Sequence, residues 1–313
     1  MTKLIRGLHN IAKAPKGVVV TIGNFDGVHL GHQALLQKVI AKARELHTLS
    51  LVITFEPQPL EFFARGNVAP RLTRFREKFC LFREYEVDVV LVIRFNAQVA
   101  NLTAVQFVQQ ILIDALQARH VIVGDDFKFG SGREGDFAFL KQAGMQAGFT
   151  TDAMPSVMLN GERVSSTRVR SALADANHAL VQDLLGRPYM MQGRVVHGDK
   201  RGRIMGFPTA NIYLHRVATP VLGVYVVRMH NIARHGLPGV ANVGTRPTMG
   251  GTRCLLEVHL FNFSDDIYGR YVRVEFCKKL RDEERYSSVD LLIEQIHKDA
   301  DRARHYFAMR REL

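Results

Sequence analysis

Two histidines follow an apolar strand pattern near the start of the chain, within residues 23–32 (GNFDGVHLGH). A helix that begins there exposes unpaired amides and the positive end of its dipole, which favours an anionic phosphate. His29 and His32 are three residues apart and share a helix face. Gly31 removes a side chain that would keep a phosphate from the backbone, and Gly23 permits a tight turn. The segment therefore predicts stabilisation of charge at a phosphorus centre, although H-x-x-H alone more often marks a surface pair or half a metal site.

A second group of hydroxyl and guanidinium side chains lies in residues 163–170 (RVSSTRVR). Ser166 and Thr167 stand at the start of an expected helix, with Arg163 and Arg170 beside them. Hydroxyls in this position often only cap the helix. Hydroxyls, amides and arginines together also form a phosphate clamp, and the histidines upstream favour the clamp.

Oxygen-bearing side chains recur further along the chain, in residues 206–211 (GFPTAN). In extended chain Thr209 and Asn211 point to the same side. A hydroxyl and an amide oxygen so placed complete the shell of a magnesium ion that keeps waters and nucleotide phosphates. Gly198 and Gly206 allow the backbone to approach a phosphate closely, although glycine-rich turns are common in barrels.

One carboxylate stands within an expected strand, in residues 255–260 (LLEVHL). Alternation puts Glu257 and His259 on one face of that strand. A carboxylate there can take the proton of an attacking hydroxyl in phosphoryl transfer. Spacing alone leaves open the reading of Glu257 as an ordinary exposed strand residue.

The elements that must position these residues change in kind near residue 186. Before it, expected strands at 17–22, 51–55, 87–95 and 120–125 alternate with helices at 33–47, 73–85, 103–117 and 135–147. Alternation of this kind predicts a parallel α/β sheet of Rossmann type with helices on both faces and ligands beyond the carboxyl ends of the strands. After it, short β-rich runs at 192–197, 223–230, 255–261 and 271–276, separated by Gly and Pro turns, predict a small antiparallel barrel. A helix over about 288–304 follows the barrel.

Composition narrows the class of protein. The chain has 313 residues, 47% hydrophobic and 23% charged, which is typical of a folded protein with two domains. The first twenty residues lack the apolar stretch of a signal peptide, and no apolar run approaches the roughly 18 residues of a membrane span. Cys80, Cys254 and Cys277 are widely spaced and form no C-x-x-C pair, so we expect neither a disulfide framework nor a zinc site, and a reducing cytoplasm as location.

The formal net charge is +12 at pH 7. Clustered basic residues would suggest nucleic acid, but here they are scattered, and the clusters at 200–203 and 302–311 are short. A basic cleft also concentrates small polyanions. We therefore expect nucleotide phosphates as partners, no nucleic acid and no membrane, and the oligomeric state is left open.

The N-terminal motifs carry a resemblance to a known family. Residues 23–32 resemble the H-x-G-H signature of the nucleotidylyltransferase superfamily, and their flanks resemble prokaryotic FAD synthetases. Residues 123–130 (VGDDFKFG) and 163–170 agree with that family. The resemblance implies nucleotide binding at Asn24 and Phe25 as well as at the glycines of the motif, and flavin binding at Asp126 and Phe127.

The C-terminal motifs carry a second resemblance. Residues 208–211 resemble the P-T-A-N motif of riboflavin kinases, which that family uses for metal and ATP, and the resemblance places the kinase glutamate at Glu257. Together the two resemblances imply an adenylyltransferase domain at 1–185 and a riboflavin kinase domain at 186–313. The implied substrates are ATP, riboflavin and FMN, with Mg²⁺ as cofactor, and the implied products are FMN and then FAD.

Two further segments match the family without a catalytic assignment. Gln58 lies in residues 55–59 (FEPQP), at a position where some members of the family have a histidine. It is therefore interpreted as part of a turn fixed by two prolines and not as a catalytic residue. Residues 242–248 (NVGTRPT) are interpreted as a flavin or nucleotide loop with no assigned role.

Two alternatives remain at this point. The first is another enzyme of the H-x-G-H superfamily, such as a pantetheine-phosphate or nicotinamide-nucleotide adenylyltransferase, against which the expected barrel and residues 208–211 argue. The second is an RNA-binding protein that combines an H-x-G-H fold with a basic barrel. That alternative predicts salt-dependent RNA binding and no flavin turnover.

Overall fold

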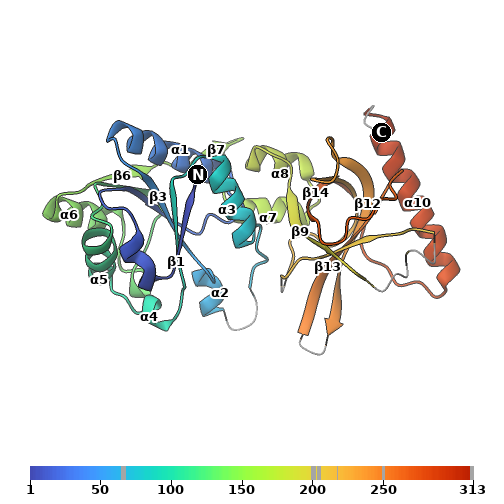
Figure 1. Cartoon of the computed structure of the whole chain (residues 1–313), viewed down its shortest axis with the longest axis horizontal. Helices are drawn as coiled ribbons and strands as arrows, with labels where there is room; N and C mark the ends of the chain where they lie inside the picture. The colour runs from blue at the N-terminus through green and yellow to red at the C-terminus, as the bar shows by residue number, and fades with distance from the viewer. Residues whose placement is uncertain (65–67, 199–201, 203–205, 217, 249–250, 311–313) are drawn as a thin grey trace. The chain divides into compact units, whose positions relative to one another are not determined.

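The structure is a computed structural model that describes all residues except 65–67, 199–201, 203–205, 217, 249–250 and 311–313. The chain divides into two compact units. The first comprises Met1–Val68 and Thr73–Ser166, and the second comprises Ala69–Leu72 and Thr167–Leu313. Figure 1 shows a strand-and-helix arrangement in the first unit and a barrel with a long helix in the second.

The first unit is built on a parallel sheet of six strands, in the order β1-β4-β3-β2-β5-β6. The strands are β1 (Lys3–Arg6), β2 (Val19–Ile22), β3 (Ser50–Phe55), β4 (Val89–Ile93), β5 (His120–Gly124) and β6 (Thr150–Met154). β2 and β4 are buried on both faces, as the continuous apolar runs predict. The predicted α/β class is confirmed, and the edge strands β1 and β6 are additions to the sequence prediction.

Helices cover both faces of this sheet. One face packs against the π-helix η2 (Val108–Ala115) and α6 (Phe137–Ala147), and the other packs against α1 (Leu30–Glu45) and α3 (Phe75–Glu84). The helix expected at 103–117 is in fact α5 (Ala104–Phe107) continued by η2, with Thr103 as its N-cap. The remaining short elements are η1 (Leu8–Lys13), α2 (Pro59–Phe63), α4 (Ala97–Ala100), η3 (Ser131–Arg133), β7 (Met158–Leu159) and β8 (Glu162–Arg163).

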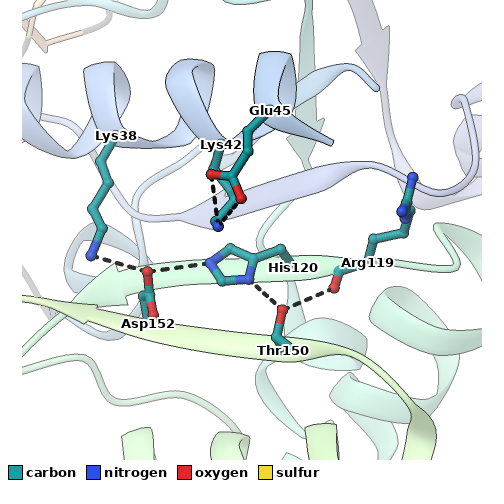
Figure 2. A network of polar contacts seen from close by, with 7 residues as sticks. All are labelled: Lys38, Lys42, Glu45, Arg119, His120, Thr150 and Asp152. Carbon is teal, nitrogen blue, oxygen red and sulfur yellow. Dashed lines mark hydrogen bonds and ion pairs between the residues drawn. The ribbon is translucent and has the colours of Figure 1, made fainter. Parts of the chain in front are cut away.

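A polar network ties α1 to the sheet (Figure 2). Lys38 on α1 forms an ion pair with Asp152 on β6, with 3.1 Å between Nζ and Oδ2. His120 on β5 lies with Nε2 3.5 Å from the same carboxylate oxygen and Nδ1 2.5 Å from the Thr150 hydroxyl. Burial lowers the pKa of His120, and the charges of Lys42 and Lys38 act in the same direction while Asp152 opposes them. The network therefore joins the middle of the helix that begins at the histidine motif to β5 and β6.

The second unit contains a closed antiparallel barrel, in the order β10-β13-β12-β11-β14-β9. Its strands are β9 (Met190–Val196), β10 (Ala210–Tyr213), β11 (Gly223–His230), β12 (Leu237–Thr248), β13 (Gly251–Leu260) and β14 (Tyr271–Arg281). The long helix α10 (Val289–Ala308) packs on β11 and β12, where Ala300, Ala303 and Phe307 are buried against Val226 and Val240. The predicted barrel and terminal helix are confirmed.

Two helices precede the barrel, α7 (Ser166–Ala174) and α8 (His178–Leu185). From Thr167 onward they pack with the second unit, and α8 contacts β14. The compact division thus falls earlier than the functional boundary expected at 185/186, which stays a prediction. No helix in the described part of the chain is long and apolar enough to cross a membrane.

Candidate active sites

The first unit has a cavity of about 300 Å³ at the carboxyl ends of β2 and β5, where a doubly wound sheet binds its ligands. The histidine motif and the end of β5 both contribute to its wall. Most of the residues predicted for nucleotide and flavin binding in this unit line it: Gly23, Asn24, Phe25, His29, Gly31, His32, Asp126, Phe127, Arg163 and Ser166.

The two histidines are stacked at the start of α1. His29 is the N-cap, and its Nδ1 accepts a hydrogen bond from the His32 amide at 3.4 Å. The ring centroids lie 3.7 Å apart at 18°. A Cβ on Gly31 would lie 3.3 Å from the His29 ring, so glycine leaves room for the stack. Two imidazoles are thereby presented together at a helix N-terminus, as the sequence predicts.

Arg163 is exposed to solvent at the cavity, and two carboxylates lie close to its guanidinium. Its guanidinium lies 2.7 Å from Asp126 and 3.8 Å from Asp125. Asp125 also accepts hydrogen bonds from the Ser156 amide and hydroxyl, each at 2.9 Å. Although burial raises the pKa of Asp125, the Ser156 hydrogen bonds and the Arg163 charge hold it below its ordinary value. The carboxylate thus stays ionised beside the arginine.

The predicted clamp is only partly assembled around this cavity. The Ser166 hydroxyl donates to the Asp26 carbonyl at 2.8 Å and lines the cavity. Thr167 and Arg170 follow in α7 but pack with the second unit, where Arg170 Nε donates to the Pro70 carbonyl at 2.8 Å. The roles of Thr167 and Arg170 stay predictions.

An aromatic cluster near the same edge of the sheet was missed in the sequence. Phe55 ends β3 and Phe95 follows β4, while Phe62 and Phe63 belong to α2. The Phe62 and Phe95 ring centroids lie 5.4 Å apart, and Phe62 and Phe63 are 40% and 63% exposed. Exposed aromatic faces offer a stacking surface for a planar ring. The signal was the apolar PLEFF run directly after a buried strand.

Gln58 begins this aromatic segment. It is the N-cap of α2, and its backbone N–H donates to Glu61 Oε2 at 2.8 Å. These contacts agree with its interpretation as a turn residue.

The second unit has a cavity of about 340 Å³ between the barrel and α10, lined by Glu257 and Thr209 among others. Strand register explains the placement of Glu257. It lies directly opposite Asn211 of β10 on one side and Asn242 of β12 on the other. Directly opposed residues share one face of a sheet. The carboxylate is therefore flanked by two amides, a relation that linear spacing does not reveal.

Asn242 also corrects one expectation. Residues 242–248, expected to form a loop, belong to strand β12. The strand continues through Pro247, and its pairing with β13 is regular from Gly239 to Thr248.

Thr209 and Asn211 carry the kinds of oxygen atom that a magnesium ion takes as ligands. The Asn211 Nδ2 donates to the Thr209 carbonyl at 3.3 Å, which orients the amide and leaves Oδ1 as an acceptor. A Cβ on Gly198 would lie 2.4 Å from that Nδ2, so only glycine fits there. Magnesium takes few protein oxygens and keeps waters and phosphates, so a hydroxyl and an amide oxygen suffice. Gly206 has a φ of 81° and supplies the left-handed turn before Phe207.

His259 shares the face of Glu257 and lines the same cavity. Its Nδ1 lies 2.9 Å from the Pro208 carbonyl oxygen. Burial lowers the pKa of His259, so the ring is neutral at neutral pH.

A second hollow of about 400 Å³ adjoins the first, since Thr209 lines both. Tyr268 lines this second hollow, and its ring lies against that of His197, with 3.8 Å between the centroids and a tilt of 32°. Two adjoining hollows that share Thr209 suit a reaction between two substrates.

The fold and the two cavities together define a class, an enzyme that handles nucleotide phosphates in two units of different architecture. The family model for FAD synthetase matches residues 11–168, and that for riboflavin kinase matches residues 185–307. The chain is 50% identical to the bifunctional riboflavin kinase/FMN adenylyltransferase of Escherichia coli K12 over 98% of both chains. It is 47% identical to the protein of that name from Haemophilus influenzae, over 97% of this chain and 99% of the other.

A solved structure also shares the fold. A protein from Streptococcus pneumoniae described as a macrolide-efflux protein matches with a TM-score of 0.78 at 33% identity, over 95% of this chain and 97% of that one. The chain belongs to the bifunctional riboflavin kinase/FMN adenylyltransferase family.

Proposed function

We propose that this protein phosphorylates riboflavin to FMN with ATP and then adenylylates FMN with a second ATP, which gives FAD and pyrophosphate. Family membership supports both reactions. The observation that carries the division of labour is the contrast between the two cavities. One presents stacked imidazoles at a helix start, and the other presents a carboxylate between two amides.

Riboflavin phosphorylation is assigned to the second unit. Glu257 accepts the proton of the ribityl 5′-hydroxyl as its oxygen attacks the γ-phosphorus of ATP, and ADP leaves. Thr209 and Asn211 would hold Mg²⁺, which when bound neutralises phosphate charge. The flavin is assigned to the cavity of Glu257 and the nucleotide to the adjoining hollow, because Thr209 lines both. Gly198 and Gly206 leave the backbone close to the phosphates.

FMN adenylylation is assigned to the first unit. An FMN phosphate oxygen attacks the α-phosphorus of ATP, and the bond to the β-phosphate breaks. That oxygen is already anionic, so the step needs no strong base. His29, His32 and Ser166 stabilise the charge that develops, with Arg163, Thr167 and Arg170 as further phosphate ligands.

Flavin binding in the first unit is assigned to Asp126 and Phe127, together with the aromatic cluster of Phe55, Phe62, Phe63 and Phe95. Exposed rings there offer a face to the isoalloxazine. We also assign the protein to the reducing cytoplasm. No disulfide joins its three cysteines, all of which lie in described parts of the chain.

One assay tests the proposal. The purified chain is incubated with riboflavin, ATP and magnesium, and the flavins are separated by chromatography. We expect FMN to appear first and FAD to follow. A folded sample that leaves both riboflavin and FMN unchanged would contradict the proposal.

A further inference from the structure

The loop that carries the first half of the histidine motif has an unusual backbone. Phe25, Gly27 and Val28 all have positive φ, at 50°, 81° and 43°. Such values are costly for a bulky or β-branched residue, and they persist only where surrounding contacts impose them. The Phe25 and Val28 side chains are fully buried. Something outside the motif must therefore hold the loop in this shape.

The loop carbonyls at alternate residues each accept a hydrogen bond from a side chain. The Asn24 carbonyl accepts from the Lys78 ammonium, and that of Asp26 accepts from the Ser166 hydroxyl at 2.8 Å. The Val28 carbonyl accepts from Gln33 Nε2 at 2.8 Å. A carbonyl oxygen that faced the cavity would repel an anionic phosphate. The hydrogen bonds to these three side chains hold the carbonyl oxygens in the protein and away from a bound phosphate.

Two backbone amides of the same loop, those of Asn24 and Phe25, are left to the ligand. Asn24 and Phe25 both line the cavity. Across the ranges that the structure describes, neither of their backbone N–H groups has a hydrogen-bond partner within the protein. Backbone amides in this arrangement bind phosphate oxygens.

Lys78 in α3 and Thr73, which lies two residues before that helix, are two of the anchors. Lys78 is fully buried, yet its ammonium reaches the Asn24 carbonyl. The Thr73 amide and hydroxyl donate to Asp26 Oδ1 at 3.0 and 3.2 Å, and the same hydroxyl accepts from the Gly27 amide at 2.9 Å. A buried ammonium is costly unless it is well bonded, so its position under the loop points to a specific use.

We propose that Lys78 and Thr73 are positioning residues for adenylyl transfer. Lys78 holds the Asn24 carbonyl away from the ligand. Thr73 fixes the Asp26 side chain and the Gly27 amide, so that the loop keeps its shape and the Asn24 and Phe25 amides meet the phosphates of ATP. The inference rests on the proposed adenylyltransferase function of this cavity. It adds that phosphate recognition there depends on side chains outside the histidine motif.

The test uses the full chain with FMN supplied directly, so that FAD formation reports the first unit alone. In the variant Lys78→Met, which keeps the side-chain volume but loses the donor, we expect kcat/KM for ATP to fall about 10- to 100-fold. The loss should appear mainly in the KM for ATP. Riboflavin phosphorylation by the same sample should be unchanged.

A second readout separates positioning from general damage. Inorganic tripolyphosphate and adenosine are compared as inhibitors of FAD formation. Lys78→Met should weaken inhibition by tripolyphosphate and leave inhibition by adenosine unchanged. Lys141→Met, on the exposed side of α6, removes the same charge away from the loop and should behave as wild type.

Thr73→Val covers the case in which Lys78→Met does not fold, because it is nearly isosteric and leaves the ammonium in place. It should give the same selective loss of tripolyphosphate inhibition, to a smaller extent. Unchanged kinetics in a folded variant would overturn the inference. So would an equal weakening of inhibition by tripolyphosphate and by adenosine. A wild-type protein that makes no FAD from FMN would refute the proposed function instead.

Discussion

The two units bring phosphate chemistry about in different ways. In the first, the site lies at the edge of a parallel sheet, on a loop with three left-handed residues that leads into α1. In the second, the key residues lie on paired barrel strands, where register alone places Glu257 between Asn211 and Asn242. The first arrangement presents backbone amides and imidazoles, and the second presents side-chain oxygens.

This difference follows the nucleophile of each reaction. An FMN phosphate oxygen is already charged, so its site needs donors that stabilise negative charge. A ribityl hydroxyl must lose a proton, so its site needs a carboxylate within reach. The two sites should therefore fail in different ways when altered.

The largest expected effect is in the barrel. Glu257→Gln keeps the shape of the side chain and removes its basicity, so riboflavin phosphorylation should fall about 10²- to 10⁴-fold. FAD formation from supplied FMN should remain normal. Chromatography of FMN and FAD measures both reactions in one sample, and a loss of adenylylation as well would break the comparison.

A somewhat smaller effect is expected in the sheet unit. His29→Ala removes one preorganised imidazole, so FAD formation should fall about 10²- to 10³-fold. FMN should accumulate when riboflavin is the substrate. A variant that formed FAD at the normal rate would remove the imidazole stack from the mechanism.

Two glycines, one in each site, allow the same comparison with a smaller expected loss of activity. A Cβ at Gly198 would lie 2.4 Å from the Asn211 amide, whereas one at Gly31 would lie 3.3 Å from the His29 ring. Gly198→Ala should therefore lower kinase activity by about tenfold, since overpacking costs on the order of 1 kcal/mol or more. Gly31→Ala should lower adenylylation less. Initial rates of both reactions test the order, and the reverse order would contradict it.

The smallest expected effect is on stability. His120 has a pKa lowered from 6.5, chiefly by burial. Below pH 6.5 the unfolded chain takes up a proton that the folded chain does not, so the free energy of unfolding falls as the pH falls. His120→Gln should reduce this fall while leaving stability at higher pH less affected. Denaturant unfolding across that pH range measures it, and an unchanged pH dependence would contradict the burial of a neutral ring.

Much of this architecture could be predicted from the sequence, because apolar runs alternate clearly with helical periods before residue 186. In the parallel sheet of the first unit the missed strands are those at the edges, whereas in the barrel β10 and β12 were missed. β1 (Lys3–Arg6) is short and bears charges, and β6 (Thr150–Met154) contains Asp152. Edge strands are half covered, so their sequences lack a continuous apolar pattern.

The candidate sites were less accessible from sequence. Local motifs indicated the histidine stack, because its members are close along the chain. The flanking of Glu257 by two amides depends on strand register, which spacing does not encode. The ion pair between Arg163 and Asp126 and the ammonium of Lys78 under the loop are also long-range contacts. The sequence alone does not show which residues form these contacts.

The central claim is that two separate sites carry out the two reactions. It is tested most directly by mixing the folded variants Glu257→Gln and His29→Ala with riboflavin, ATP and magnesium. Neither variant alone should produce appreciable FAD, and the mixture should, because the His29→Ala protein supplies FMN that the Glu257→Gln protein adenylylates. A mixture that produces no more FAD than either variant alone, with no FMN from the His29→Ala protein, would contradict the account.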